Sequence, residues 1–129
     1  SVPGQVIPGG EYYDFNAKYV DNSSELIIPA RISKALGDEI RFMAREAFAA
    51  IGGSGLARVD FLVSQTKAYI NEINTLPGFT SISMYPKLWE ATGIPYQDLI
   101  TNLINLAQAR FMVEESLTKT IELEKGLEV

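Results

Sequence analysis

The chain of 129 residues contains no cysteine and no histidine. Together these absences exclude disulfides, thiolate nucleophiles, imidazole bases and the usual zinc ligands. Any metal ion that the chain binds must therefore be held by oxygen atoms. The sequence also lacks an uninterrupted apolar run near the roughly 20 residues that a bilayer-spanning helix needs, so no membrane span is expected.

Positive charge is sparse, because 11 Lys and Arg stand against 16 Asp and Glu, for a net charge of −5. The basic residues are scattered, whereas a nucleic-acid groove needs them clustered, so no nucleic-acid partner is expected. A nucleotide still fits if a metal ion and one or two local cations neutralise its phosphates. No cleavable signal opens the chain, which predicts the cytoplasm. The start at Ser1-Val2-Pro3, without Met, suggests a fragment.

The rest of the composition, 47% hydrophobic and 21% charged, is typical of one globular domain. Short strands are predicted at Val6-Ile7 and at 26–28, with a long loop between them. An apolar stripe at helical spacing follows Ser33, a favourable N-cap, and stops at Gly52-Gly53. The pattern predicts one amphipathic helix over this range.

Two further strands, 56–63 and 68–74, are predicted to form a hairpin around a polar turn at 65–67. A loop rich in Pro, Gly, Ser and Thr leads to a short helix, 84–92, in which Tyr85 and Trp89 are expected to be core residues. Pro95 opens a longer helix. These elements predict an α+β fold, mainly antiparallel sheet with flanking helices.

The hairpin carries polar side chains at alternate positions. If its turn has three residues, Asp60 lies opposite Glu72 and Arg58 lies opposite Asn74, all on one face. Opposed carboxylates repel each other unless a positive charge lies between them, and Mg²⁺ prefers such oxygen ligands. A register slipped by one residue would separate the two carboxylates and remove the site. The alternative is an ordinary solvent-facing side of an amphipathic hairpin.

Arg58 is permanently charged, so it suits a phosphate or a developing oxyanion better than the role of a base. Beyond Gly78, backbone N–H groups and the hydroxyls of Ser81 and Ser83 indicate a pocket for a carboxylate. The alternative for the serines is capping of the helix that begins at Met84. Capping and ligand binding can also coexist.

The early loop gathers aromatic and charged residues, and functional residues often collect on loops. For Tyr12, Tyr13 and Phe15, packing under the loop is the favoured interpretation. Lys18 and Tyr19 are predicted to act in a lid, because an ammonium group and a phenol can hold a phosphate and orient a substrate.

Four segments resemble, in the right order, the C-terminal part of D-alanine:D-alanine ligase, an ATP-grasp enzyme of peptidoglycan synthesis. The resemblance runs from about residue 3 to residue 110. The segments are YDFNAKY at 13–19, LIIPA at 26–30, GLARVDF at 55–61 and NEINTLPGFTSISMYP at 71–86.

The resemblance implies ATP-dependent condensation of two D-alanines through an acyl phosphate, by the C-terminal subdomain of an ATP-grasp fold in the bacterial cytoplasm. In-line phosphoryl transfer depends mainly on positioning and charge neutralisation, which suits a site without His or Cys. ATP is the nucleotide substrate, and two Mg²⁺ or Mn²⁺ ions are the implied cofactors.

By position, the resemblance also implies a role for each site residue. The metal ligands would be Asp60, Glu72 and Asn74, and the nucleotide contacts would be Lys18, Asn71 and Glu72. The catalytic groups would be Arg58, Tyr19 and the Gly78 N–H, and the second D-alanine would contact Ser83, Met84 and Tyr19. Tyr at position 19 is similar to dipeptide-forming members rather than to those that form an ester with D-lactate.

The resemblance divides residues 1–129 into a lid at 8–29, a catalytic hairpin at 56–74, a substrate loop at 75–84 and C-terminal helices at 84–125. The family's N-terminal and central domains, which hold the first D-alanine and grip ATP, are not expected in this chain. Alone, the chain is therefore expected to be inactive, and the full-length enzyme is expected to be a homodimer. The alternatives are another ATP-grasp carboxylate–amine ligase and a non-catalytic metal-binding or structural fragment.

Overall fold

The computed structural model describes residues 1–8, 25–80 and 82–117. In chain order the elements are β1 Gln5–Ile7, β2 Glu25–Ile27, α2 Lys34–Ala50, β3 Arg58–Ser64, β4 Lys67–Asn74, α3 Met84–Glu90 and α4 Tyr96–Ser116.

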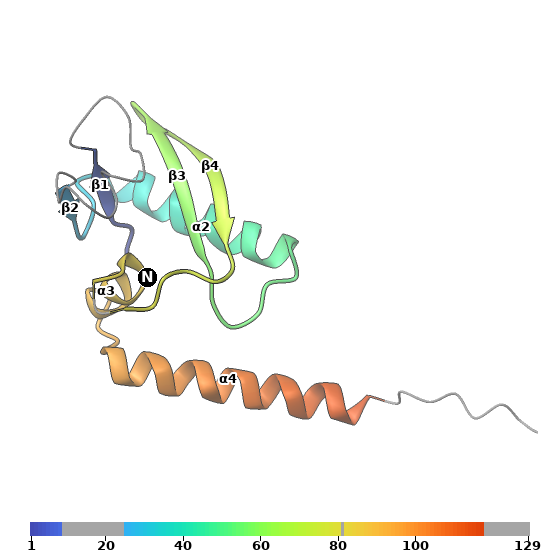
Figure 1. The fold of residues 1–129 in the computed structure, drawn as a ribbon. Helices are drawn as coiled ribbons and strands as arrows, with labels where there is room; N and C mark the ends of the chain where they lie inside the picture. Colours follow the sequence, from blue (N-terminus) through green and yellow to red (C-terminus); the bar gives the residue numbers. More distant parts are fainter. Residues whose placement is uncertain (9–24, 81, 118–129) are drawn as a thin grey trace, which may run out of the picture.

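Two antiparallel pairs of strands form the β structure, β1 with β2 and β3 with β4. In Figure 1, α2 lies behind the β3–β4 hairpin, α3 lies below β1 and β2, and α4 runs beneath the rest of the molecule. Helices and short antiparallel sheets are thus combined, which confirms the predicted α+β class.

Helix α2 forms where the apolar stripe predicts it. Ser33 occupies the N-cap, and its hydroxyl accepts a hydrogen bond from the Leu36 N–H at 3.2 Å. Leu36 and Ile40 are buried on the inner face of the helix. Gly52 has φ 64°, a left-handed conformation that glycine adopts without strain and that ends helices.

The β3–β4 hairpin turns over two residues, where the sequence predicted three. Ser64 pairs with Lys67, not with Ala68. Gln65, in the turn, has φ 56°. A two-residue loop matches the twist of the strands when its φ values are positive, so the backbone accepts this conformation at Gln65 even without glycine.

A β-bulge restores the predicted pairing further along the hairpin. Continued regularly, the register from the turn would pair Asp60 with Asn71 and move Glu72 to the other face. The register instead shifts by one residue, Asn71 is skipped, and Asp60 pairs with Glu72 while Arg58 pairs with Asn74. The bulge therefore gathers the polar side chains on one face.

The N-terminal segment packs closely against α3. A Cβ atom at Gly4 would lie 2.7 Å from Leu88 Cδ2 and 2.8 Å from Met84 Cε. A larger residue at position 4 would therefore require the ends of the Leu88 and Met84 side chains to shift. The Ala30 N–H donates to the Pro3 carbonyl at 2.9 Å, which ties the segment to the end of the β1–β2 pair.

Aromatic rings connect the loop after β4 to α3 and α4. Phe79 lies 5.5 Å from both Tyr85 and Tyr96, measured between ring centroids. Tyr85 is buried, as the sequence predicted, whereas Trp89 is half-buried at 6.5 Å from it. Edge-to-face and tilted ring pairs of this kind add to the energy of burial alone.

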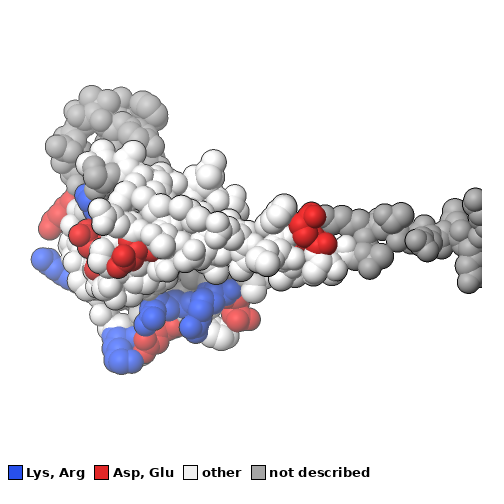
Figure 2. Space-filling model, turned by 90° about the horizontal axis from the view of Figure 1, so that it is seen from below, with Lys and Arg blue, Asp and Glu red and all other residues white. Residues whose placement is uncertain are grey.

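Helix α4 has little cover. Among the described residues of α4, Leu99 is buried, whereas Ile104, Phe111 and Met112 are exposed. Seen from below in Figure 2, the helix presents a long, mostly uncharged surface with acidic residues toward its far end. No helix in the described ranges is both long and apolar enough to cross a bilayer.

Candidate functional site

The polar face of the hairpin is organised around an arginine and an aspartate on β3. Arg58 Nε donates to Asp60 Oδ1 at 2.7 Å, and Arg58 Nη2 donates to Asp60 Oδ2 at 2.8 Å. Two parallel N–H···O bonds of this kind are the strong bidentate form of a carboxylate–guanidinium pair. Residues two apart on a strand share a face, so the strand itself makes this pair possible.

Glu72, on β4, completes an ionic cluster with this pair. Its Oε1 lies 3.7 Å from Arg58 Nη2, and its side chain is 56% exposed. From the sequence, the positive charge between Asp60 and Glu72 was expected to come from a metal ion. In this structure the guanidinium supplies positive charge to both carboxylates, and it does so from the same face.

Asn74 and Asn71 differ in their surroundings, because Asn74 makes a hydrogen bond to the backbone and Asn71 is exposed to solvent. The Asn74 Oδ1 accepts a hydrogen bond from the Leu76 N–H at 3.1 Å, which turns the chain out of β4. That oxygen is the one predicted to bind metal, so it has a structural partner here. Asn71 is the exposed residue at the bulge.

The loop after β4 holds Ser83 turned back toward Gly78. The Ser83 Oγ accepts from the Thr80 N–H at 3.1 Å and lies 2.9 Å from Thr80 Oγ1. A Cβ at Gly78 would lie 3.0 Å from the same oxygen. Ser83 stands at the N-cap of α3 but its side chain makes no capping bond, so the capping interpretation is wrong for this hydroxyl. Ser81 lies outside the described residues.

The Met84 side chain packs between elements, because its Cε approaches the Gly4 backbone. Any contact between Met84 and a substrate carboxylate would therefore use its backbone N–H. Lys18 and Tyr19, the predicted lid residues, lie outside the described residues, as do Tyr12, Tyr13 and Phe15.

Tyr96 has a role that the sequence did not predict. Its hydroxyl donates to the Phe79 carbonyl at 2.9 Å, across 17 residues of sequence, and its ring packs on Phe79. Phe79 follows Gly78 directly, so α4 holds the loop after β4 in place at this point. A tyrosine at the first turn of a helix gives no sign of such a contact in the sequence.

The oxygen atoms of Asp60, Glu72 and Asn74 are the kind of ligand that a hard divalent cation such as Mg²⁺ prefers. Asp60 and Glu72 are directly paired across the strands and both reach solvent, so a divalent cation that replaced Arg58 as their counterion would contact both carboxylates. Two carboxylates and an amide also match the sparse protein ligation that Mg²⁺ accepts when phosphates and water complete its shell. Within the described ranges, no group of three or more acidic, His or Cys residues could hold a metal ion.

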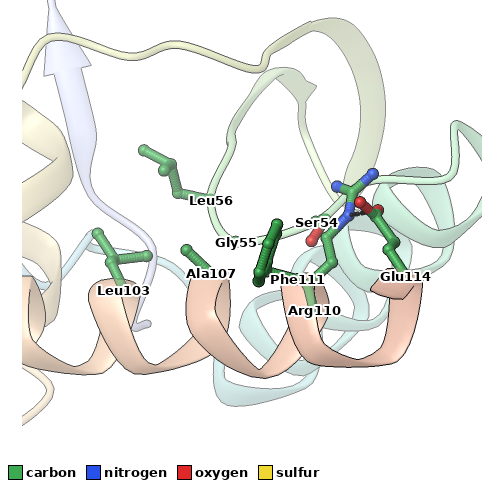
Figure 3. Close-up of a pocket in the computed structure, with 8 residues that line it drawn as sticks. All are labelled: Ser54, Gly55, Leu56, Leu103, Ala107, Arg110, Phe111 and Glu114. Atoms are coloured by element: carbon green, nitrogen blue, oxygen red, sulfur yellow. Dashed lines mark hydrogen bonds and ion pairs between the residues drawn. The ribbon is translucent and has the colours of Figure 1, made fainter. Parts of the chain in front are cut away.

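Two hollows lie along α4, apart from the polar face. One of about 280 Å³ is shown in Figure 3, where Phe111 and Ala107 face the loop at Gly55 and an Arg110–Glu114 ion pair lies at its edge. The other, about 410 Å³, passes beneath Pro77 and Phe79 and is almost entirely apolar. Neither is lined by Asp60 or Glu72.

Comparison with known proteins places the chain. A family model described as the C-terminus of D-ala D-ala ligase matches residues 1–105. Over 113 residues the chain is 58% identical to a D-alanine--D-alanine ligase of Heliobacterium modesticaldum, a match that covers 86% of this chain and 31% of that relative. The chain thus spans about a third of the length of the relative it matches.

Solved structures agree with this match. The D-alanine-D-alanine ligase from Coxiella burnetii is 43% identical, with a TM-score of 0.69 over 71% of this chain and 27% of that one. The VanG D-Ala:D-Ser ligase from Enterococcus faecalis is 33% identical, with a TM-score of 0.70 over 80% of this chain and 30% of that one. The chain therefore belongs to the D-alanine:D-alanine ligase family, in which it corresponds to the C-terminal part.

Proposed function

We propose that this chain supplies the metal-binding and substrate-carboxylate half of a D-alanine:D-alanine ligase active site. The observation that carries the proposal is the Asp60–Glu72 pair on one face of the hairpin. This face runs directly into the Gly78–Ser83 loop, in a chain that belongs to the ligase family. The reaction is the ATP-dependent joining of two D-alanines through an acyl phosphate.

Asp60, Glu72 and Asn74 are the proposed ligands of two Mg²⁺ or Mn²⁺ ions, with Asn71 and Glu72 facing the nucleotide. Bound metal would neutralise the charge that builds up on the ATP phosphates during transfer. The strand pairing holds the two carboxylates at adjacent positions, so the metal ligands are in place before the metal ions bind.

Arg58 and the Gly78 N–H are the proposed donors to the oxyanion that forms when the second D-alanine attacks. The Ser83 hydroxyl and the Met84 N–H would receive the carboxylate of that substrate. Ser83 lies against Gly78, so both groups act at the same end of the loop. Donors fixed in advance at a developing charge account for large rate effects, about 100- to 1,000-fold for each donor.

The remaining parts of the proposal rest on the family. Lys18 and Tyr19 would close over the phosphates and substrate from the lid at 8–29. ATP-gripping groups and the site for the first D-alanine would come from the domains that make up the rest of the relatives' length. We place the complete enzyme, a homodimer, in the bacterial cytoplasm.

The second substrate is the point where another candidate has support, because a D-Ala:D-Ser ligase shares the fold at 33% identity. Tyr19 favours a dipeptide product over an ester with D-lactate but does not separate D-alanine from D-serine. The 58% identity to a D-alanine--D-alanine ligase favours D-alanine as the second substrate. An enzyme of wider ATP-grasp type, or a non-catalytic fragment, would have no need for the Ser83 hydroxyl to face Gly78.

A chimeric ligase tests the activity. The matching C-terminal part of the 58%-identical Heliobacterium ligase would be replaced by this chain, and phosphate release would be measured with ATP and D-alanine or D-serine. We expect phosphate release that depends on D-alanine. Glu72→Gln should lower its rate by at least about 100-fold. The 129-residue chain alone should release no phosphate. A folded chimera that is inactive beside an active parent would count against the function.

Metal titration of the 129-residue chain tests the site separately. Mg²⁺, with and without ADP, should shift the amide resonances of Asp60 and of 72–78. Asp60→Asn should abolish these shifts, whereas Asp98→Asn, in the first turn of α4, should leave them unchanged. Shifts that spread evenly over the surface acidic residues would contradict a metal site on the hairpin.

A further inference from the structure

We propose that Arg58 is an internal counterion that holds the metal site closed, and that an arriving divalent cation must displace it from Asp60. This inference rests on the proposed metal role of Asp60 and Glu72. The inference adds the displacement of Arg58 to the proposed metal binding. The same guanidinium is the proposed donor to the oxyanion, and it cannot bind Asp60 and the oxyanion at once.

The geometry shows how strongly Arg58 is committed to the aspartate. Both oxygens of Asp60 accept from it, at 2.7 and 2.8 Å, in the bidentate form that fixes orientation as well as distance. The Arg58 side chain is only 20% exposed and that of Asp60 33% exposed, so water screens this pair incompletely. The Glu72 carboxylate, at 3.7 Å, adds a second, weaker attraction.

A metal ion ligated by Asp60 would approach the same oxygens that Arg58 now occupies. A divalent cation and a guanidinium at one carboxylate repel each other, and both cannot keep their best geometry there. The two cations therefore compete. Arg58 offsets the repulsion between the opposed carboxylates and so stabilises the pairing of Asp60 with Glu72 across the strands.

The competition couples metal binding to the oxyanion site. When the cation binds Asp60, the Arg58 guanidinium is released from that carboxylate and becomes available to the proposed oxyanion. Coupling is reciprocal, so an anion that draws Arg58 away from Asp60 should raise the affinity for metal by the same factor. Without bound metal, the protein would then present Arg58 to an anion less readily, so metal and anion would each favour binding of the other.

Two substitutions at Arg58 separate this competition from simple charge repulsion. Mn²⁺ affinity of the 129-residue chain would be measured by calorimetry for the wild type, Arg58→Lys and Arg58→Gln. Lysine keeps the charge but loses the planar fork. We expect roughly threefold tighter binding for Arg58→Lys and roughly tenfold for Arg58→Gln. An affinity for Arg58→Lys equal to the wild type would overturn the proposal, because charge alone would then explain the effect.

The matched control is Arg110→Gln on α4, which removes a guanidinium paired with Glu114 at 2.7 Å. Its Mn²⁺ affinity should equal that of the wild type. A change as large as that of Arg58→Gln would show a non-specific effect of net charge and would also overturn the proposal. Amide spectra of each variant confirm that it is folded.

A direct readout comes from the Arg58 side chain itself. Its Nε–H resonance should be visible in the metal-free wild type, and Mg²⁺ should shift it as the bond to Asp60 Oδ1 breaks. If Mg²⁺ shifts the Asp60 and Glu72 amides but leaves the Nε–H resonance in place, this inference fails and the metal site stands. If Mn²⁺ binds neither wild type nor variants, the proposed metal role fails, and the inference with it.

Discussion

At the scale of single residues, the Arg58–Asp60 pair should contribute to stability as well as to binding. Asp60→Asn leaves a guanidinium that is mostly withdrawn from water without its bidentate partner. We expect a loss of about 1 kcal/mol in the free energy of unfolding, since partial exposure of the pair limits the cost. Urea denaturation without metal measures it. Asp38→Asn, which removes the fully exposed partner of Lys34, should have little effect, and equal losses for both would contradict the assignment.

Tyr85 gives the fold a dependence on alkaline pH. Burial raises the pKa of its hydroxyl, and a hydrogen bond with Trp89 partly offsets this. An unfolded tyrosine ionises near pH 10, so the unfolded chain releases a proton that the folded chain retains. The contribution of Tyr85 is complete below about pH 10 and is lost as pH rises through its raised folded pKa.

Thermal unfolding between about pH 8 and 11.5 tests this dependence. Tyr85→Phe should reduce the fall in melting temperature at the alkaline end, because the ionisable group is gone. The control is Tyr69→Phe, which changes an exposed tyrosine of β4. A pH profile of Tyr85→Phe that matches the wild type would show that other groups account for alkaline unfolding.

The individual site residues were predictable because strand alternation and the quoted motifs depend only on local sequence. Arg58, Asp60, Glu72 and Asn74 do share a face. Their pairwise contacts were not predictable. A side chain with several rotatable bonds chooses among neighbours that only the folded structure brings together, which is why Arg58 as a partner of Asp60 was missed.

At the scale of elements, α4 positions the loop after β4, the proposed substrate loop, through Tyr96. Tyr96→Phe keeps the ring on Phe79 but removes the hydroxyl that donates to its carbonyl. We expect a loss of about 0.5 to 1 kcal/mol in the free energy of unfolding, because the bond is solvent-exposed. Amide relaxation should show increased motion at Phe79 and Thr80. Tyr69→Phe is the control, and unchanged loop motion in Tyr96→Phe would contradict the role.

In the β3–β4 hairpin, the predicted pairing of Asp60 with Glu72 is correct, but the predicted turn is not. The sequence predicted a three-residue turn that would pair Asp60 with Glu72. The structure has a two-residue turn and a bulge at Asn71, which together give the same pairing. Bulges depend on how the strands twist against their neighbours, and the local sequence pattern carries little sign of them.

At the scale of the whole molecule, the described residues bury few large apolar side chains, namely Leu36, Ile40, Tyr85 and Leu99. Large apolar side chains of α4, among them Ile104, Phe111 and Met112, are exposed, and Figure 2 shows that much of the surface along this helix is uncharged. Contiguous exposed apolar surface on a folded chain commonly marks a contact surface.

The 129-residue chain should accordingly bind the dye ANS with a several-fold rise in fluorescence. Ile104 and Phe111 are 53% and 63% exposed, so changing both to Ser should lower the signal while circular dichroism shows α4 intact. Fusion to the remaining domains in the chimera should lower it too. An ANS signal no greater than that of a well-packed protein of similar size would contradict this account of α4.

The sequence by itself determined the elements, the α+β class, the family and the identity of the polar residues, because hydrophobic periodicity, capping and local motifs are properties of neighbouring residues. Only the tertiary structure decided the bulge that brings Glu72 opposite Asp60, the Arg58 fork between the carboxylates, and the Tyr96 contact with the substrate loop. These depend on distances between residues far apart in the chain, and such distances are fixed when sheets and helices pack.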